Sequence, residues 1–214
     1  MLLIENGKAP DDPYNARLGF WLPPDTPYGN LQLKYMKIIW RFDEANRKII
    51  DSWNFWKECS TGGMLPTGVL ERHIFSIEET VYMLRRAGDE LVSMIWLLEK
   101  HEDQKKYPSR IKIDCLGAVV AQAEDARVQV FSDHVDLMEK LNDIANAFKH
   151  SFINSDHTLM GFAEPRIHAL GLSYNKLSSD PVFYDVKLDE LVSKYNEFYK
   201  DSVQWLSEYS ERNR

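Results

Sequence analysis

The sequence predicts an all-α protein, an up-down bundle of about five helices with a small β-hairpin inserted before the last helix. Three observations predict this fold. Long segments without glycine or proline place apolar residues three and four positions apart, which is the spacing of one helix face. Over about residues 165–187 this spacing changes to the alternation that is typical of strands. The length of 214 residues suits one helical domain, residues 30–214, preceded by an N-terminal arm.

Residues 1–29 are predicted to form an extended, proline-rich arm. The segment contains five prolines and three glycines. A proline inside a helix removes a hydrogen bond and clashes with the preceding turn, so this segment cannot be helical. Its apolar stretch LGFWLP, residues 18–23, is expected to anchor the arm to the body of the protein or to a partner subunit.

The first two predicted helices carry long apolar stripes. Residues 31–57 contain no glycine or proline, and their apolar side chains recur at helical spacing, which predicts one long amphipathic helix. The stretch STGGMLPTG, residues 60–68, ends this helix. A second helix is predicted to begin at a capping box of Ser76 and Glu79 and to end near residues 101–110.

The second half of the chain is predicted to hold three more helices and the hairpin. One helix covers about residues 110–122, and the next begins near Asp133. The core stripe of this fourth helix consists of Leu137, Leu141, Ile144, Phe148 and Phe152. Residues 165–175 and 181–188 are expected to pair as strands around the turn KLSSD. The last helix covers about residues 188–210.

Charge and composition narrow the classes of function. The formal net charge of -7 disfavours broad, nonspecific nucleic-acid binding, because such binding needs a basic surface, although a local basic patch is compatible with it. The longest apolar run, residues 91–98, is too short to cross a bilayer, so no membrane partner is expected. The first residues lack the features of a signal peptide, and the chain has two cysteines, Cys59 and Cys115. These features together predict a reduced, cytoplasmic setting.

Motifs for metal or nucleophilic chemistry are absent from the sequence. The six histidines form neither a Glu-x-x-His nor a His-Glu-x-x-His pattern, and the cysteines form no cluster. We therefore expect neither a metal ion nor another cofactor. The chain also lacks the Gly-x-Ser-x-Gly elbow of serine hydrolases.

Two arginines of the second predicted helix are candidate ligand-binding residues. Arg85 is spaced four positions from Asp89, and Arg86 is spaced four positions from Glu90. Such pairs usually brace a solvated helix face. The alternative is that Arg85 or Arg86 points at a phosphate or at the polar edge of the fourth helix, since a guanidinium can donate two parallel hydrogen bonds to phosphate.

The segment DIANAFKHSF, residues 143–152, places several polar side chains at one edge of a helix. At about 100° per residue, Asn142 and Lys149 lie at a border of the apolar stripe, Asn146 lies just beyond it, and His150 points away from the core. One interpretation is an ordinary solvated surface. The other is that His150 transfers a proton or contacts a ligand, because imidazole titrates near neutral pH. Lys149 would then help to attract a phosphate, and Asn142 would contact the ligand.

This pattern, with NAFKH late in the fourth predicted helix, resembles the HEPN superfamily (higher eukaryotes and prokaryotes nucleotide-binding) over about residues 31–153. The resemblance implies a helical bundle that commonly dimerises. Many members are metal-independent ribonucleases of toxin-antitoxin, phage-defence and RNA-processing systems. Their signature is an arginine, typically followed by a polar residue such as asparagine, and then a histidine. The sites of two subunits come together across the dimer interface.

Compared residue by residue, His150 matches the histidine of this signature and Asn146 matches the polar residue. The arginine position falls on Ala145, and a shifted register does not supply an arginine. In the ribonuclease members that arginine would stabilise charge developing on the phosphate. Lys149 or an arginine of the second helix could replace it, although a lysine offers only a point charge. The resemblance therefore implies binding more than cleavage.

Three functions stay open at this point. The favoured one is a HEPN-like homodimer that acts as a noncatalytic binding or regulatory module for RNA, a nucleotide or a partner protein, in a toxin-antitoxin or phage-defence setting. The second is a metal-independent HEPN-type endoribonuclease that uses His150 with Lys149, Asn146 and an arginine from position 85 or 86. The third is an unrelated helical-bundle scaffold, which a fold with separated second and fourth helices would favour.

Overall fold

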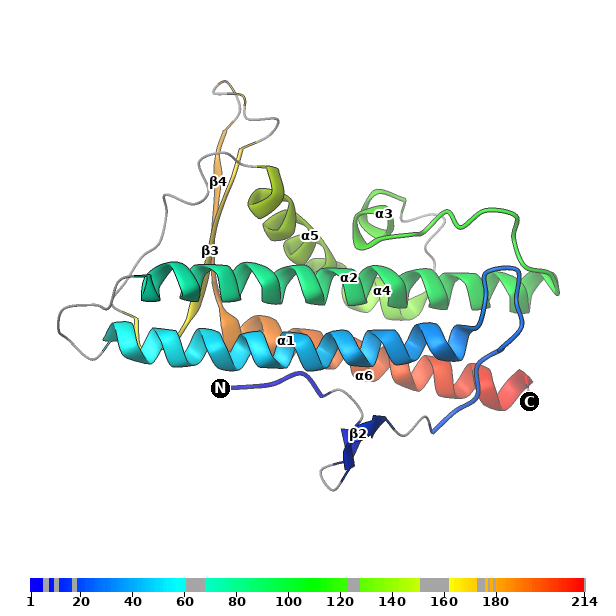
Figure 1. Ribbon diagram of the computed structural model, residues 1–214. Coiled ribbons are helices and arrows are strands. Elements are labelled where there is room, and N and C mark those ends of the chain that lie inside the picture. Colours follow the sequence, from blue (N-terminus) through cyan, green and yellow to red (C-terminus); the bar gives the residue numbers. More distant parts are fainter. Residues whose placement is uncertain are drawn as a thin grey trace.

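Three long helices form the body of the protein in the computed structural model. The structure describes residues 1–5, 8–9, 12–16, 19–60, 68–122, 128–150, 162–172, 176, 178 and 180–213. The long helices are α1 (Leu31–Ser60), α2 (Val69–Gln104) and α6 (Leu188–Asn213). They lie side by side along the molecule, with α1 antiparallel to α2 and α6 (Figure 1). The predicted helical bundle with a hairpin before its last helix is confirmed.

Helix α2 begins earlier than its predicted capping box. Gly68 precedes the first turn with a left-handed backbone, φ 86°, which glycine adopts without a steric penalty. Ser76 is buried inside the helix, and its carbonyl oxygen accepts a hydrogen bond from the Thr80 hydroxyl at 2.8 Å. The predicted start at residue 76 is wrong because His73, Ser76 and Thr80 occupy inward positions of the first turns, where an apolar pattern does not reveal them.

Aromatic side chains join α6 to the other long helices. The Phe42 ring of α1 makes edge contacts with Tyr195 and Tyr199 of α6, at centroid distances of 5.8 and 4.8 Å. The hydroxyl oxygens of Tyr35 and Tyr199 lie 2.6 Å apart in the core. The Tyr195 hydroxyl donates a hydrogen bond of 2.9 Å to the carbonyl of Leu84 in α2. Ring contacts therefore hold α6 against α1, and a tyrosine hydroxyl joins it to α2.

Between α2 and the hairpin, the described residues form three helices where the sequence predicted two. Helix α3 (Leu116–Ala121) is shorter than the predicted helix over residues 110–122. The predicted fourth helix, expected to begin near Asp133, corresponds to α5 (Val135–His150). The short helix α4 (Gln129–Asp133), which was not predicted, precedes it, and the two meet at the nonhelical His134. Helix α5 leans steeply across α2 in Figure 1. Phe152 lies outside the described residues.

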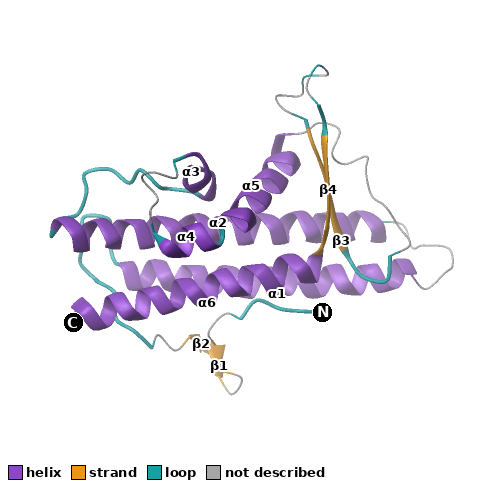
Figure 2. Cartoon of the chain, turned by 180° about the vertical axis from the view of Figure 1, so that it is seen from behind, coloured by secondary structure: helices purple, strands orange, loops and turns teal. Residues whose placement is uncertain are grey.

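The predicted hairpin is confirmed and stands beside α5. Strands β3 (Arg166–Gly171) and β4 (Val182–Lys187) pair antiparallel, with Ile167 opposite Val186 and Ala169 opposite Tyr184. Figure 2 shows the hairpin crossing the long helices next to α5. Ile167 and Ala169 are buried, as their alternation predicts. His168, which lies between them in β3, is buried as well, and its ring stacks on Phe183 at 5.9 Å between centroids.

The N-terminal arm packs against the body of its own chain. It contains two short antiparallel strands, β1 (Lys8–Ala9) and β2 (Asp12–Ala16), which the sequence pattern did not predict. Phe20 and Leu22 are buried in the core, so the apolar stretch of the arm anchors to the body as expected. Near the N-terminus, the amide of Ile4 donates a hydrogen bond of 2.7 Å to Asn46 of α1.

Within the described ranges, no helix is both long enough and apolar enough to span a bilayer. The thiols of Cys59 and Cys115 are free and half-buried.

Candidate functional site

The polar residues of the predicted site lie along one edge of α5. Lys149 and His150 are exposed in its last turn, as the helical spacing indicates. Asn142 and Asn146 are half-buried and lie two turns and one turn earlier. These four residues are here called the α5 edge. Their side chains share the side of α5 that is not committed to the apolar core.

The position that matches the missing arginine lies inside the protein. The side chain of Ala145 is 1% exposed and belongs to the core together with Leu141 and Ile144. An arginine at this position would have to bury a charged group without water, which is strongly unfavourable. Because position 145 faces the core, it cannot supply a guanidinium to the α5 edge.

Helix α2 supplies an arginine to the other end of the α5 edge. The Arg85 Nη2 atom donates a hydrogen bond of 3.3 Å to the Asn142 Oδ1 atom. Arg85 therefore points at the polar edge of the fourth predicted helix, as the alternative interpretation of the sequence expected. The Arg85 Nε atom is buried and has no hydrogen-bond partner among the described residues. The structure thus brings together two of the predicted ligand-binding residues.

Two residues that the sequence did not single out extend this contact to the hairpin. The Asn142 amide lies 3.5 Å from Asp143 Oδ1, and the Tyr184 hydroxyl of β4 donates to Asp143 Oδ2 at 3.2 Å. Burial raises the pKa of Tyr184, and the nearby carboxylate of Asp143 raises it further, so the hydroxyl stays protonated and can donate. Nothing in the sequence indicated that the strand carrying Tyr184 would lie beside α5.

An aromatic contact and a close backbone approach complete the surroundings of the α5 edge. The rings of Tyr82 in α2 and Phe148 in α5 meet edge to face at 6.5 Å between centroids. On the other side, a Cβ atom on Gly117 of α3 would lie 3.1 Å from the Asn142 Oδ1 atom. Glycine at position 117 therefore lets α3 approach Asn142 closely.

Asp89 is not part of a solvated pair with Arg85, so that prediction is wrong. Its side chain is buried, and its Oδ1 atom accepts a hydrogen bond of 2.9 Å from the backbone amide of Leu116, the first residue of α3. Burial raises the pKa of Asp89, while this hydrogen bond and the charges of Arg85 and Arg86 oppose the rise. Asp89 therefore holds α3 against α2.

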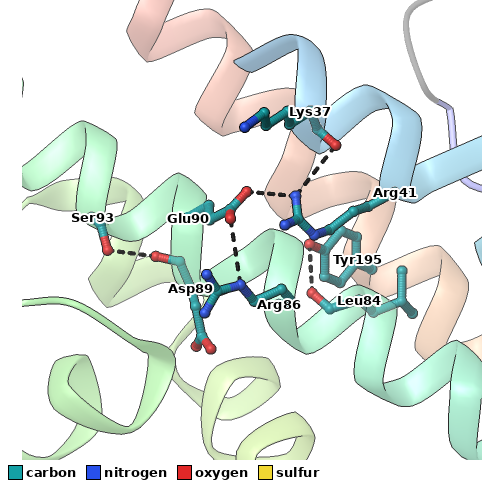
Figure 3. A network of polar contacts seen from close by, with 8 residues as sticks. All are labelled: Lys37, Arg41, Leu84, Arg86, Asp89, Glu90, Ser93 and Tyr195. Carbon is teal, nitrogen blue, oxygen red and sulfur yellow. Dashed lines mark hydrogen bonds and ion pairs between the residues drawn. The ribbon is translucent and has the colours of Figure 1, made fainter. Parts of the chain in front are cut away.

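Arg86 faces α1 rather than α5. Its Nε atom lies 3.4 Å from a Glu90 carboxylate oxygen, which confirms the predicted pair. The other Glu90 oxygen accepts a hydrogen bond of 2.8 Å from Arg41 of α1 (Figure 3). Arg41 also donates to the Lys37 carbonyl at 3.4 Å. The two neighbouring arginines of α2 therefore serve different surfaces, and Arg86 does not join the α5 edge.

The spacing along α5 separates Arg85 from the predicted acid–base residue. The Arg85 guanidinium contacts Asn142, and His150 is eight positions further along the helix. At 1.5 Å per residue this corresponds to about 12 Å along the helix axis. The Arg85 guanidinium therefore lies beside a residue about two turns of α5 before His150.

In the part of the chain that the structure describes, no group of three or more His, Cys, Asp or Glu side chains is arranged to hold a metal ion. Comparisons of the chain with protein-family models, with curated proteins and with solved structures gave no match.

Proposed function

We propose that this chain is a HEPN-like homodimer that binds RNA at the α5 edge as a noncatalytic, regulatory module, in a toxin-antitoxin or phage-defence setting. The observation that carries the proposal is the burial of Ala145, which is 1% exposed at the position where the ribonuclease signature has its arginine. The exposed Lys149 and His150 remain as groups that can contact a phosphate backbone.

The charges at the α5 edge suit binding better than cleavage. Cleavage of a phosphodiester requires donors preorganised around the phosphate on which charge develops. Arg85 is instead hydrogen-bonded to Asn142, about 12 Å along the helix axis from His150. Lys149 can attract a phosphate as a point charge but does not offer the two parallel donors of a guanidinium. Separate cations along an edge suit contacts to several phosphates of one strand.

A dimer would double this binding surface. The resemblance implies that the α5 edges of two subunits meet, and the exposure of His150 at the end of α5 supports that placement. Sedimentation in the ultracentrifuge should then give twice the 25.0 kDa mass of one chain. A fold in which α2 and α5 are not adjacent would favour an unrelated scaffold. In this structure the two helices are adjacent, since a hydrogen bond joins Arg85 of α2 to Asn142 of α5.

Binding is tested by fluorescence anisotropy with a labelled single-stranded RNA over a range of salt concentrations. We expect Lys149→Gln to weaken binding and to reduce the slope of log K against log salt by about 1, the value for one lost phosphate contact. Lys57→Gln is the matched control, because Lys57 is an exposed lysine in the last turn of α1. Absence of RNA binding, or an equal loss in both variants, would overturn the proposal.

The second candidate is a metal-independent endoribonuclease that uses His150 and a borrowed arginine. The specific observation in its favour is that the Arg85 guanidinium does reach α5, 3.3 Å from the Asn142 Oδ1 atom. This function predicts that RNA is cut and that His150→Ala abolishes the cleavage. Cleavage that is unchanged in His150→Ala would rule it out.

A further inference from the structure

A cavity lies between α1 and α2, on the side that Arg86 faces. Its volume is about 440 Å³. That size lies within the range of small-molecule sites, about 300–1,000 Å³. The segment that follows α2 borders it through Ile111 and Asp114, and the N-terminal arm borders it through Tyr28. The Tyr28 hydroxyl donates a hydrogen bond of 2.6 Å to the Pro108 carbonyl, which ties the arm to the segment after α2.

One wall of the cavity is apolar. Leu31 of α1 and Met94 and Leu97 of α2 line it with side chains that are otherwise buried in the core. The ring of Tyr28 and the side chain of Ile111 are half-buried at its margin. A flat apolar group of a ligand could be removed from water against this wall, which is the usual source of small-molecule affinity.

Four basic side chains also line the cavity, in a protein with a net charge of -7. They are Lys34, Lys37 and Arg41 of α1 and Arg86 of α2. Figure 3 shows Arg41 and Arg86 converging on Glu90, so that one carboxylate serves two guanidinium groups. Among the ion pairs between described residues, none uses Lys34 or Lys37.

The acidic residues of the cavity do not cancel this positive charge. Glu90 is shared between the two arginines. Asp89 is turned toward α3, where it accepts the Leu116 amide, and its burial disfavours the charged form. Asp114 is exposed at the margin. A local excess of positive charge beside low-dielectric walls attracts an anion more strongly than the same charges on an open surface.

We propose that this cavity binds a small phosphomonoester with a flat apolar group. The phosphate dianion lies between the amines of Lys34 and Lys37 and the guanidinium of Arg86, and the apolar group lies against Leu31, Met94 and Leu97. Charge-assisted hydrogen bonds from lysine and arginine are the strong contacts available to such a group. The site is separate from the α5 edge and does not rest on the proposed RNA binding.

Isothermal titration calorimetry with phenyl phosphate tests this site. Inorganic phosphate and phenol, which correspond to the two halves of phenyl phosphate, are titrated separately for comparison. We expect phenyl phosphate to bind with a Kd on the order of 1 mM or tighter, from the usual affinity per ligand atom. Each half should bind more weakly than the whole. The proposal would be overturned if phenyl phosphate showed no saturable binding, or if inorganic phosphate bound as tightly as phenyl phosphate.

Two pairs of substitutions on α1 locate the binding. The double variant Lys34→Gln and Lys37→Gln should weaken phenyl phosphate binding roughly tenfold, because it removes two charged donors. The control is Arg47→Gln with Lys57→Gln, which makes the same charge change on the same helix outside the cavity lining. All four residues lie on the surface of α1, so circular dichroism should show unchanged helix content. An equal loss of affinity in both double variants would place the binding elsewhere.

Discussion

At the scale of single residues, a buried histidine is expected to make the fold sensitive to acid. His73 is 2% exposed, and its Nδ1 atom donates a hydrogen bond of 3.1 Å to the Ser52 carbonyl. Burial lowers the pKa of His73, the hydrogen bond to Ser52 opposes this effect, and the charge of His168 lowers the pKa further. Burial also lowers the pKa of His168, although Asp185 opposes the change.

The lowered pKa of His73 predicts a loss of stability at mildly acidic pH. An unfolded histidine has a pKa of about 6.5, so below that pH the unfolded chain binds more protons than the folded protein. The free energy of unfolding should therefore fall as the pH falls below about 6.5. Urea denaturation of the wild type and of His73→Gln, at about pH 7.5 and about pH 5.5, measures this effect.

The His73→Gln variant should lose less stability than the wild type between these two pH values, because its side chain does not titrate. His168→Gln serves as a second variant with the same expectation, since burial lowers the pKa of His168 as well. If the free energy of unfolding had the same pH dependence in the wild type and in both variants, the acid sensitivity would not come from these two histidines.

The sequence could locate some site residues but not their partners. Helical spacing correctly places Asn146 and His150 away from the core. This placement requires only the apolar pattern of a single helix. The contact of Arg85 with Asn142 depends on how α2 and α5 cross, and the sequence left it as an alternative. The burial of Asp89 could not be read from its spacing to Arg85, because it follows from the distant amide of Leu116.

At the scale of elements, the long helices were predictable because their apolar stripes are uninterrupted. Each of α1, α2 and α6 buries a stripe that one face of a helix can carry. The start of α2 was missed because polar residues such as His73 face inward in its first turns. Helix α4 was missed because its five residues are too few to show a periodic apolar stripe.

The tyrosine pair between α1 and α6 predicts a measurable coupling between these helices. The hydroxyls of Tyr35 and Tyr199 lie 2.6 Å apart. Burial raises the pKa of both and brings that of Tyr199 to about 12, so both are neutral. Tyr35→Phe or Tyr199→Phe alone should lower the free energy of unfolding by about 1 kcal/mol, because one buried hydroxyl loses its partner. The double variant should cost less than the sum of the two.

A double-mutant cycle measured by urea denaturation gives this coupling energy, which we expect to be about 1 kcal/mol. Tyr209→Phe serves as the control partner for Tyr35→Phe, because Tyr209 lies ten positions beyond Tyr199, about 15 Å along α6. Its effect should add to that of Tyr35→Phe. Strict additivity of Tyr35→Phe and Tyr199→Phe would show that the hydroxyls do not stabilise each other.

At the scale of the whole molecule, function depends on contacts between segments that are far apart in the sequence. Arg85 reaches Asn142, and Tyr184 reaches the neighbouring Asp143, because α5 packs against both α2 and the hairpin. The cavity beside Arg86 forms where the arm, α1, α2 and the segment before α3 come together. Such arrangements arise from packing, so the periodic pattern of one segment does not contain them. The two surfaces face different sides of α2 and can therefore be tested independently.

The central claim is that the α5 edge holds RNA without cutting it, and one measurement tests this most directly. A labelled RNA is incubated in EDTA with the wild-type protein at a concentration that saturates binding, and its length is followed on a denaturing gel. The burial of Ala145 predicts that the RNA stays intact while it remains bound. Cleavage by the wild type that disappears in His150→Ala would contradict the claim and establish a ribonuclease.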